Sequence, residues 1–284
     1  MFHLLEPRFG DLSVARNKQR LLVEWFQSRL FTATGLEQKP VEDKIMRECR
    51  NGGDFLRIVM EETARRQGVK RWAECTPDHV LYLPRIKQTI PNALVIHLIR
   101  DGRDVALSME KQGWPKQLPW DGMSRRMAGA VYWEWMTRKG RRDGEQLGSD
   151  YCEVRYEQLV SEPRAVLKQL GSFVEQELDY DEIQRVAIGS VSRPNTSFKA
   201  GEGEGFAPVG RWKKFCSAEE AALMEDLIGD YLRELGYEAS GQRARTWRAS
   251  ALRAQYMAYF ESKFYLRAKT PAGRWLVSRD LSRV

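Results

Sequence analysis

The chain has 284 residues, of which 42% are hydrophobic, so it can bury a sizeable core, most simply as one domain with additions. Its net charge of +7 suits a polyanionic nucleotide or an acidic substrate. It contains no run near the roughly 20 apolar residues of a membrane span, and its first residues lack the charged start and long apolar core of a signal peptide. The four cysteines are widely separated and do not cluster with histidine, so we expect a cytoplasmic protein with scattered thiols and no metal site.

Helical periodicity dominates the predicted elements. Apolar residues such as Leu21, Leu22 and Trp25 recur at helical spacing and predict a helix over 11–31. Further helices are predicted from Pro40 to the break at Gly52, and over 54–67, 78–89, 122–139, 163–175, 180–188 and 217–235. Strands are predicted over 70–74, 93–99 and 150–155, and the glycine-spaced residues 190–211 are typical of a loop.

The most informative stretch is the strand over 93–99 and the RDGRD turn that follows it. The strand is a nearly continuous apolar run, a pattern that predicts burial on both faces in a parallel sheet. Arg100 and Arg103 then stand at the carboxyl end of the strand, beside the start of a helix that Asp101 or Asp104 caps. Guanidinium groups and helix N–H groups favour a phosphate or sulfate at this place. The alternative is an ordinary strand–helix connection with solvated charges.

Five short motifs in one order extend this reading. The pair Arg100 and Ser108 resembles the 3′-phosphate-binding element of sulfotransferases that use the donor 3′-phosphoadenosine-5′-phosphosulfate (PAPS). The other four motifs resemble family segments at residues 72–77 (WAECTP), 154–160 (VRYEQLV), 209–213 (VGRWK) and 235–237 (LGY). The RDGR sequence at residues 100–103 resembles the tyrosylprotein-type and bacterial branches of the family more than the cytosolic aryl type. The resemblance implies an α/β fold like that of P-loop kinases, a parallel sheet flanked by helices, and transfer of a sulfonate group from PAPS to a hydroxyl or amine without a metal.

The resemblance also implies roles for individual residues. Arg100 and Ser108 hold the 3′-phosphate, Tyr156 contacts the nucleotide, and Arg211 and Lys213 close over it. The segment 2–8 (FHLLEPR) resembles the place where tyrosylprotein-type enzymes carry a catalytic glutamate, which makes Glu6 the candidate base. Simpler readings stay open for two of these residues: Tyr156 as a packing residue with a satisfied hydroxyl, and Glu6 as a frayed terminal carboxylate. Trp212, inside the late motif, is expected to be a core anchor.

Two departures from the family pattern stand out. No segment matches the strand and R-S-G-T-T-like loop that bind the 5′-phosphosulfate, and Cys75 stands where the family has a lysine, for which Lys70, Arg71 or Arg103 are possible substitutes. We therefore expect transfer to be poor or absent. The sequence is either a piece of a longer enzyme or a shortened, non-catalytic nucleotide-binding or scaffold relative that has lost turnover. Without the loop-bearing strand, the strands over 93–99 and 150–155 are predicted to lie about two strand spacings apart, roughly 9–10 Å.

The expected domain covers residues 1–239, and residues 240–284 form a basic, aromatic and helical C-terminal extension. This extension is predicted to dock on the domain or on a sister subunit, giving a homo-oligomer, with binding to a membrane surface as a further alternative. The expected partners are the nucleotide donor and a hydroxyl or amine acceptor. Nucleic-acid binding is not expected because no recognised module is present, and a P-loop kinase is the weaker enzyme reading because a Walker A lysine is absent.

Overall fold

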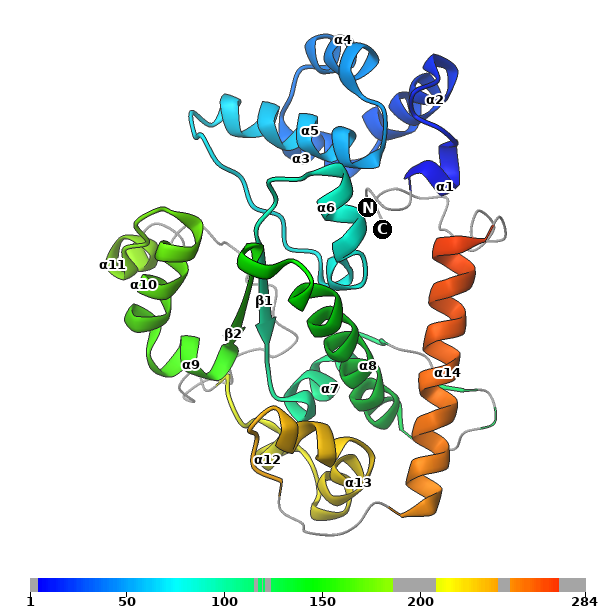
Figure 1. Ribbon diagram of the computed structural model, residues 1–284, viewed down its shortest axis with the longest axis vertical. Coiled ribbons are helices and arrows are strands. Elements are labelled where there is room, and N and C mark those ends of the chain that lie inside the picture. Colours follow the sequence, from blue (N-terminus) through cyan, green and yellow to red (C-terminus); the bar gives the residue numbers. More distant parts are fainter. Residues whose placement is uncertain are drawn as a thin grey trace. The chain divides into compact units, whose positions relative to one another are not determined.

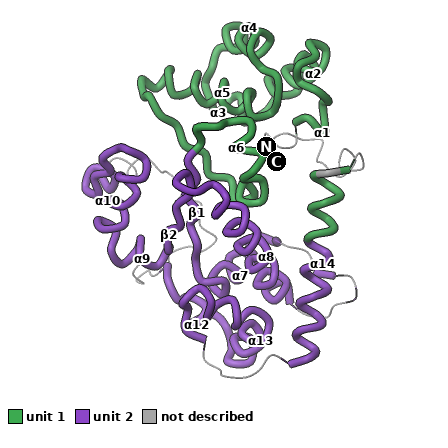
Figure 2. Tube along the Cα trace, in the orientation of Figure 1, with its two compact units in different colours: residues 1–93, 261–284 green, residues 94–260 purple. Residues whose placement is uncertain are grey.

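The computed structural model describes residues 5–114, 117, 118, 120, 124–185, 208–239 and 246–270. The chain forms two compact units, one of residues 1–93 and 261–284 and the other of residues 94–260 (Figure 2). The glycine loop around Gly201 and the last fourteen residues lie outside the described part.

The first unit is helical (Figure 1). Its N-terminal elements are α1 (Leu5–Phe9), α2 (Ala15–Phe26), α3 (Arg29–Thr34), α4 (Gln38–Glu48), α5 (Gly52–Arg66), the 3-10 helix η2 (Pro77–Leu81) and α6 (Leu83–Thr89). The single helix predicted over 11–31 is wrong, because Ser28 has an extended backbone and its hydroxyl accepts the Phe31 N–H, so that α3 starts afresh. Asn51 caps α5, so this helix starts two residues before the predicted start at residue 54.

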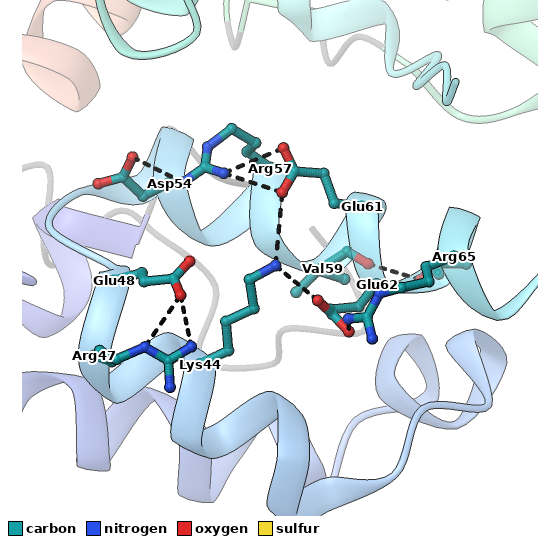
Figure 3. Close-up of polar contacts among 10 residues, drawn as sticks. Lys44, Arg47, Glu48, Asp54, Arg57, Val59, Glu61, Glu62 and Arg65 are labelled. Atoms are coloured by element: carbon teal, nitrogen blue, oxygen red, sulfur yellow. Dashed lines mark hydrogen bonds and ion pairs between the residues drawn. The ribbon is translucent and has the colours of Figure 1, made fainter. Parts of the chain in front are cut away.

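An aromatic cluster forms the centre of this unit. Trp25 is 1% exposed and packs edge-on against Phe31 and Phe55, with ring centroids 4.8 and 5.0 Å away. The surrounding buried residues come from α1, α2, α4 and α5. At the surface, Lys44 reaches from α4 between Glu61 and Glu62 of α5, as Figure 3 shows. The two helices are therefore joined both by apolar packing and by ion pairs.

Residues 70–74 do not form the predicted strand. They have no regular structure, most of them are exposed, and no described segment pairs with them. A strand needs a neighbouring strand to satisfy its backbone groups, and this segment has none in the described part of the unit.

The second unit contains the sheet, which consists of two parallel strands in the described residues. β1 (Val95–Ile99) pairs directly with β2 (Tyr151–Arg155), with Val95 opposite Tyr151 and Ile99 opposite Arg155. The predicted separation of two strand spacings is therefore wrong, and with it the inference that a missing loop-bearing strand leaves these two strands apart. Direct pairing is the favourable alternative because it satisfies the backbone groups along both facing edges.

The two faces of β1 differ in exposure, contrary to the expectation that both are buried. Ile99 is 2% exposed, whereas Ile96 and Leu98 on the other face are 44% and 48% exposed. On that same face the neighbouring residue of β2, Val154, is covered by Val166 and Leu170 of α10 (Pro163–Val174). The apolar run in β1 thus exceeds what the described helices cover.

Helices complete the second unit. They are α7 (Gly102–Lys111), α8 (Arg125–Glu145), the 3-10 helix η3 (Gly148–Asp150), α9 (Tyr156–Ser161), α10, α11 (Tyr180–Ile183), α12 (Trp212–Phe215), α13 (Ala218–Glu234) and α14 (Trp247–Lys269), whose end belongs to the first unit. Most of α8 is buried, and it packs against α7 and α13. Gly102 permits the close approach of α7, because a Cβ there would lie 2.3 Å from the Trp133 ring.

The described residues of the C-terminal extension, 246–270, are mostly helical, and α14 packs on α8 within the second unit. Tyr256 and Phe260 of α14 are buried, and the Phe260 ring packs against Tyr132 and Trp135 of α8. Arg253 also forms two hydrogen bonds, of 2.7 and 2.6 Å, with the fully buried Glu134.

Among the described helices, none combines the length and the apolar character needed to cross a membrane.

Candidate functional site

Arg100 lies where β1 ends, and the strand register brings it to Tyr156. Ile99 is paired with Arg155, so the residues that follow the two strands are neighbours at one edge of the sheet. The Arg100 guanidinium lies over the Tyr156 ring, 4.8 Å from its centroid. Its Nη2 donates to the Pro208 carbonyl at 2.5 Å and to Asp104 Oδ2 at 3.2 Å. The predicted neighbourhood of Arg100, Tyr156 and the late motif is present.

Asp104 ties the late motif to this place. Its side chain is fully buried, and its carboxylate accepts the backbone N–H groups of Gly210 and Trp212, each at 2.8 Å. Arg211 lies between these two residues and is half-buried, while Lys213 is exposed. The sequence suggested Asp104 only as a helix cap, a role that Asp101 fills by accepting the Arg103 N–H. The available signal was the second aspartate of the RDGRD turn, one more than the helix cap needs.

Arg103 is a buried anchor whose guanidinium is already engaged by two carboxylates. It is 2% exposed, forms two side-chain hydrogen bonds with Asp101 at 3.0 and 2.8 Å, and donates to Glu225 of α13 at 2.7 Å. Its guanidinium stacks on the Trp212 ring at 3.8 Å, which supports the expected anchoring role of Trp212. Burial alone would lower the pKa of Arg103, but Asp101 and Glu225 outweigh it and raise that pKa. Arg103 is therefore not a substitute for the lysine that Cys75 replaces.

A second carboxylate joins three of the motifs. Glu157 accepts the Asp101 N–H at 2.8 Å through one oxygen and the Tyr237 hydroxyl at 3.0 Å through the other. Arg155 lies over the Tyr237 ring, 5.0 Å from its centroid. Burial is the largest cause that raises the pKa of Tyr237, and the charge of Glu157 adds to it. The RDGRD, VRYE and LGY segments therefore form one connected network, which sequence order alone did not reveal.

Ser108 is half-buried on α7, and its carbonyl accepts the Gln112 N–H at 3.1 Å. It lies on the helix that starts at the RDGRD turn, two helical turns beyond Arg100. The assignment of its hydroxyl to a phosphate stays a prediction.

Glu6 belongs to the first unit and is an ordered residue of α1, not a frayed terminal carboxylate. It forms an ion pair with Arg85 of α6. Both line a pocket of about 630 Å³ together with Asn51, Pro84, Gln88 and Thr89. The carboxylate thus lines a pocket, and its role as a base stays a prediction.

The WAECTP segment lies in the same unit as Glu6. Cys75 is exposed there, and Thr76 and His79 both hydrogen-bond to Glu74. Burial alone would raise the pKa of Glu74, but these hydrogen bonds outweigh it and lower that pKa. The segment is therefore folded locally around its glutamate, leaving the thiol at the surface.

Arg100 also carries the observation that best suits an anionic ligand. Its Nε is buried and has no hydrogen-bond partner in the described residues, and a fifth of its side chain is exposed. An under-satisfied guanidinium at the end of a parallel strand fits a phosphate group.

Across the same described residues, no group of three or more His, Cys, Asp or Glu side chains could hold a metal ion.

Comparison with known proteins gives one family. The family model described as "Sulfotransferase family" matches residues 6–181. The match spans more than half of the chain and includes Glu6, Arg100, Ser108 and Tyr156, but it ends before the late motif. A search of the curated proteins finds no match to the chain.

Proposed function

The chain belongs to the sulfotransferase family, and from that membership we propose that it transfers a sulfonate group from PAPS to a hydroxyl or amine acceptor. The observation that carries the choice of donor is Arg100 at the end of β1, stacked on Tyr156 and joined to the late motif. The carboxyl edge of a parallel sheet is the usual ligand side of an α/β fold, and a guanidinium there selects an anion.

In this proposal Arg100 and Ser108 hold the 3′-phosphate of the nucleotide. Tyr156 contacts the nucleotide with the ring face that Arg100 does not cover, and Arg211 and Lys213 add positive charge from the late motif. The buried ion pairs around Arg103 keep the turn rigid, so that Arg100 needs little reorganisation when the nucleotide binds.

The transfer forms a bond from the acceptor oxygen or nitrogen to sulfur, while the bond from sulfur to the 5′-phosphate oxygen breaks. The acceptor proton passes to a base, and Glu6 is the candidate. Its ion pair with Arg85 orients the carboxylate within its pocket. Cys75, in place of the family's lysine, is expected to keep the rate low, because a neutral thiol does not stabilise the charge on the transferring group.

Calorimetry with adenosine 3′,5′-bisphosphate tests the nucleotide site. Arg100→Ala should weaken binding about ten- to hundredfold, the effect of losing a charge-assisted contact. Arg164→Ala is the matched control, because Arg164 also pairs with a carboxylate and stacks on a tyrosine, but on an exposed surface of α10. Equal affinities for the wild type and Arg100→Ala would exclude the assignment.

Activity needs a separate test. Incubation with radiolabelled PAPS and panels of phenols, alcohols and amines should label an acceptor, slowly but above an Arg100→Ala control. Nucleotide binding without any transfer would instead support the non-catalytic relative that the sequence left open.

A further inference from the structure

We propose that the exposed face of the first half of α14 is the contact surface of a homodimer, in which the α14 helices of two copies pack antiparallel. The inference concerns association of the chain with itself. It depends neither on the proposed nucleotide site nor on transfer activity.

α14 is fixed in the second unit by one side and carries exposed residues on the other. Tyr256 and Phe260 are buried, and the Phe260 ring contacts aromatic rings of α8. The opposite side, here called the α14 face, consists of Trp247, Ala251, Ala254 and Ala258, all of them exposed. At about 100° per residue, these four positions lie within about 60° of one another around the helix. Because the buried side already holds the helix in place, the α14 face is rigid before any partner binds.

Two exposed tryptophans mark this part of the molecule as a contact surface. Trp247 is 75% exposed, and Trp120, beside the α14 face, is 72% exposed. Trp120 is tied to the helix because its Nε1 donates to Gln255 Oε1 at 3.3 Å. An indole ring buries a large area while losing few rotamers, and tryptophan is enriched among the residues that dominate protein interfaces. Two such rings at one helix therefore indicate a surface that a partner covers.

The order of large and small side chains selects a second copy of the chain as that partner. The four positions are spaced by four, three and four residues, the spacing of a coiled-coil seam. Residues 247 and 258 are equally far from the middle of this segment, and so are residues 251 and 254. A twofold axis through the middle thus places Trp247 over the partner's Ala258, and Ala251 over the partner's Ala254. Each large ring meets a methyl group, and the central alanines let the helix axes approach to about 8 Å.

The chemistry of the α14 face favours protein over lipid as its occupant. A helix that lies on a membrane buries large apolar side chains such as leucine and phenylalanine in the bilayer. The α14 face instead presents mostly methyl groups, and its exposed neighbours on the helix include Ser250 and Gln255. Such groups gain little from lipid, whereas close packing of alanine against alanine is what two matching helices provide.

The size of the contact predicts a weak and reversible dimer. The paired segment runs from Trp247 to Ala258, about 18 Å of helix. With the rings of Trp247 and Trp120 from both copies, it buries roughly 800–1,200 Å² in total, the range of weak and transient protein contacts. We therefore expect a dissociation constant of roughly 1–100 μM.

Sedimentation velocity on the full chain, from about 1 to 200 μM, tests the inference. The wild type should shift reversibly from monomer to dimer. Trp247→Ala should weaken the dimer about tenfold or more, because it removes the ring at both ends of the contact. Ala258→Trp should weaken it similarly, because two large rings then face each other. Combining Trp247→Ala with Ala258→Trp exchanges ring and methyl group, so the double variant should regain most of the lost affinity.

Two controls match these changes at other exposed positions. Trp114, which follows α7, is 55% exposed, and Ala222 is exposed on α13. Trp114→Ala and Ala222→Trp should leave the dimer unchanged, and circular dichroism should show the same helix content in all variants. Binding of adenosine 3′,5′-bisphosphate tests the proposed function separately, since none of these substitutions lies at the Arg100 site.

Four outcomes would overturn the inference. A wild type that stays monomeric at about 200 μM has no such dimer. A dimer that persists unchanged in Ala258→Trp uses another surface. A double variant that is weaker than both single variants contradicts the antiparallel pairing. A monomeric chain that co-sediments with phosphatidylserine vesicles, and loses this binding in Trp247→Ala, assigns the α14 face to a lipid surface instead.

Discussion

Replacing Arg103 with alanine should destabilise the second unit, because Arg103 is the counter-charge of two buried carboxylates. The side chains of Asp101 and Glu225 are each 9% exposed, and Arg103 itself is 3% exposed. Removing one partner of a buried ion pair costs about 3–5 kcal/mol, since it leaves uncompensated charge behind. Arg103→Lys keeps the charge but loses the paired hydrogen bonds and the stack on Trp212, so its cost should be about 2 kcal/mol.

Arg100→Ala is the informative comparison, three residues away in the same motif. Asp104 keeps its two backbone hydrogen bonds when Arg100 is removed, so the stability cost should be only about 1 kcal/mol. Urea unfolding followed by tryptophan fluorescence measures the stabilities, and calorimetry without urea measures the affinity for adenosine 3′,5′-bisphosphate. The reasoning would be refuted if Arg103→Ala unfolded at the urea concentration of the wild type and lost as much affinity as Arg100→Ala.

Four further predictions concern other parts of the chain. Burial lowers the pKa of His97 to about 4, against about 6.5 in an unfolded chain, so the unfolded state binds more protons between these pH values and stability should fall by about 2 kcal/mol from pH 7 to pH 5. His97→Leu should remove that part of the slope in urea unfolding, and an identical slope would contradict it. Glu6→Gln should lower kcat about a hundredfold at unchanged nucleotide affinity; a wild-type kcat would mean that another group takes the proton. Cys75→Lys should raise kcat roughly tenfold in the radiolabel assay, and an equal or lower rate would count against the expected role of a lysine there. Glu134→Ala should cost about 3–5 kcal/mol in urea unfolding, and adding Arg253→Ala should recover part of it, whereas fully additive losses would argue against their coupling.

The sequence predicted the elements that carry strong local signals. The strands β1 and β2 and the helices α10 and α13 lie close to their expected bounds, because apolar periodicity, Pro163 and the capping box at Ser217 mark them. The sulfotransferase family was also identified from short motifs, and the family match confirms it. These signals lie within one segment of the chain or in the order of several motifs. They can therefore be recognised without knowing which residues pack beside each element.

The errors concern what lies beside each element. Whether β1 pairs with β2 depends on the competition among backbone partners, which the residues of either strand do not encode. The same holds for residues 70–74, where a strand-like pattern found no partner in the described part. Asp104 was missed for a related reason, since its partners Gly210 and Trp212 are more than a hundred residues away.

Those long separations have a consequence for how the protein is made. Asp104 and Gly210 are 106 residues apart, and Arg103 and Glu225 are 122 residues apart. At about 5–20 residues per second, the RDGRD turn leaves the ribosome roughly 5–20 s before the segment that its buried carboxylate holds. During that interval Asp104 has Arg100 as a partner and Arg103 has Asp101, but Gly210, Trp212 and Glu225 are absent. Closing such long loops is slow compared with forming local helices. The nascent chain therefore completes this network only after α13 has been synthesised. Translation pauses between residues 104 and 225 should then lower the yield of folded protein more than pauses within the helices of the first unit.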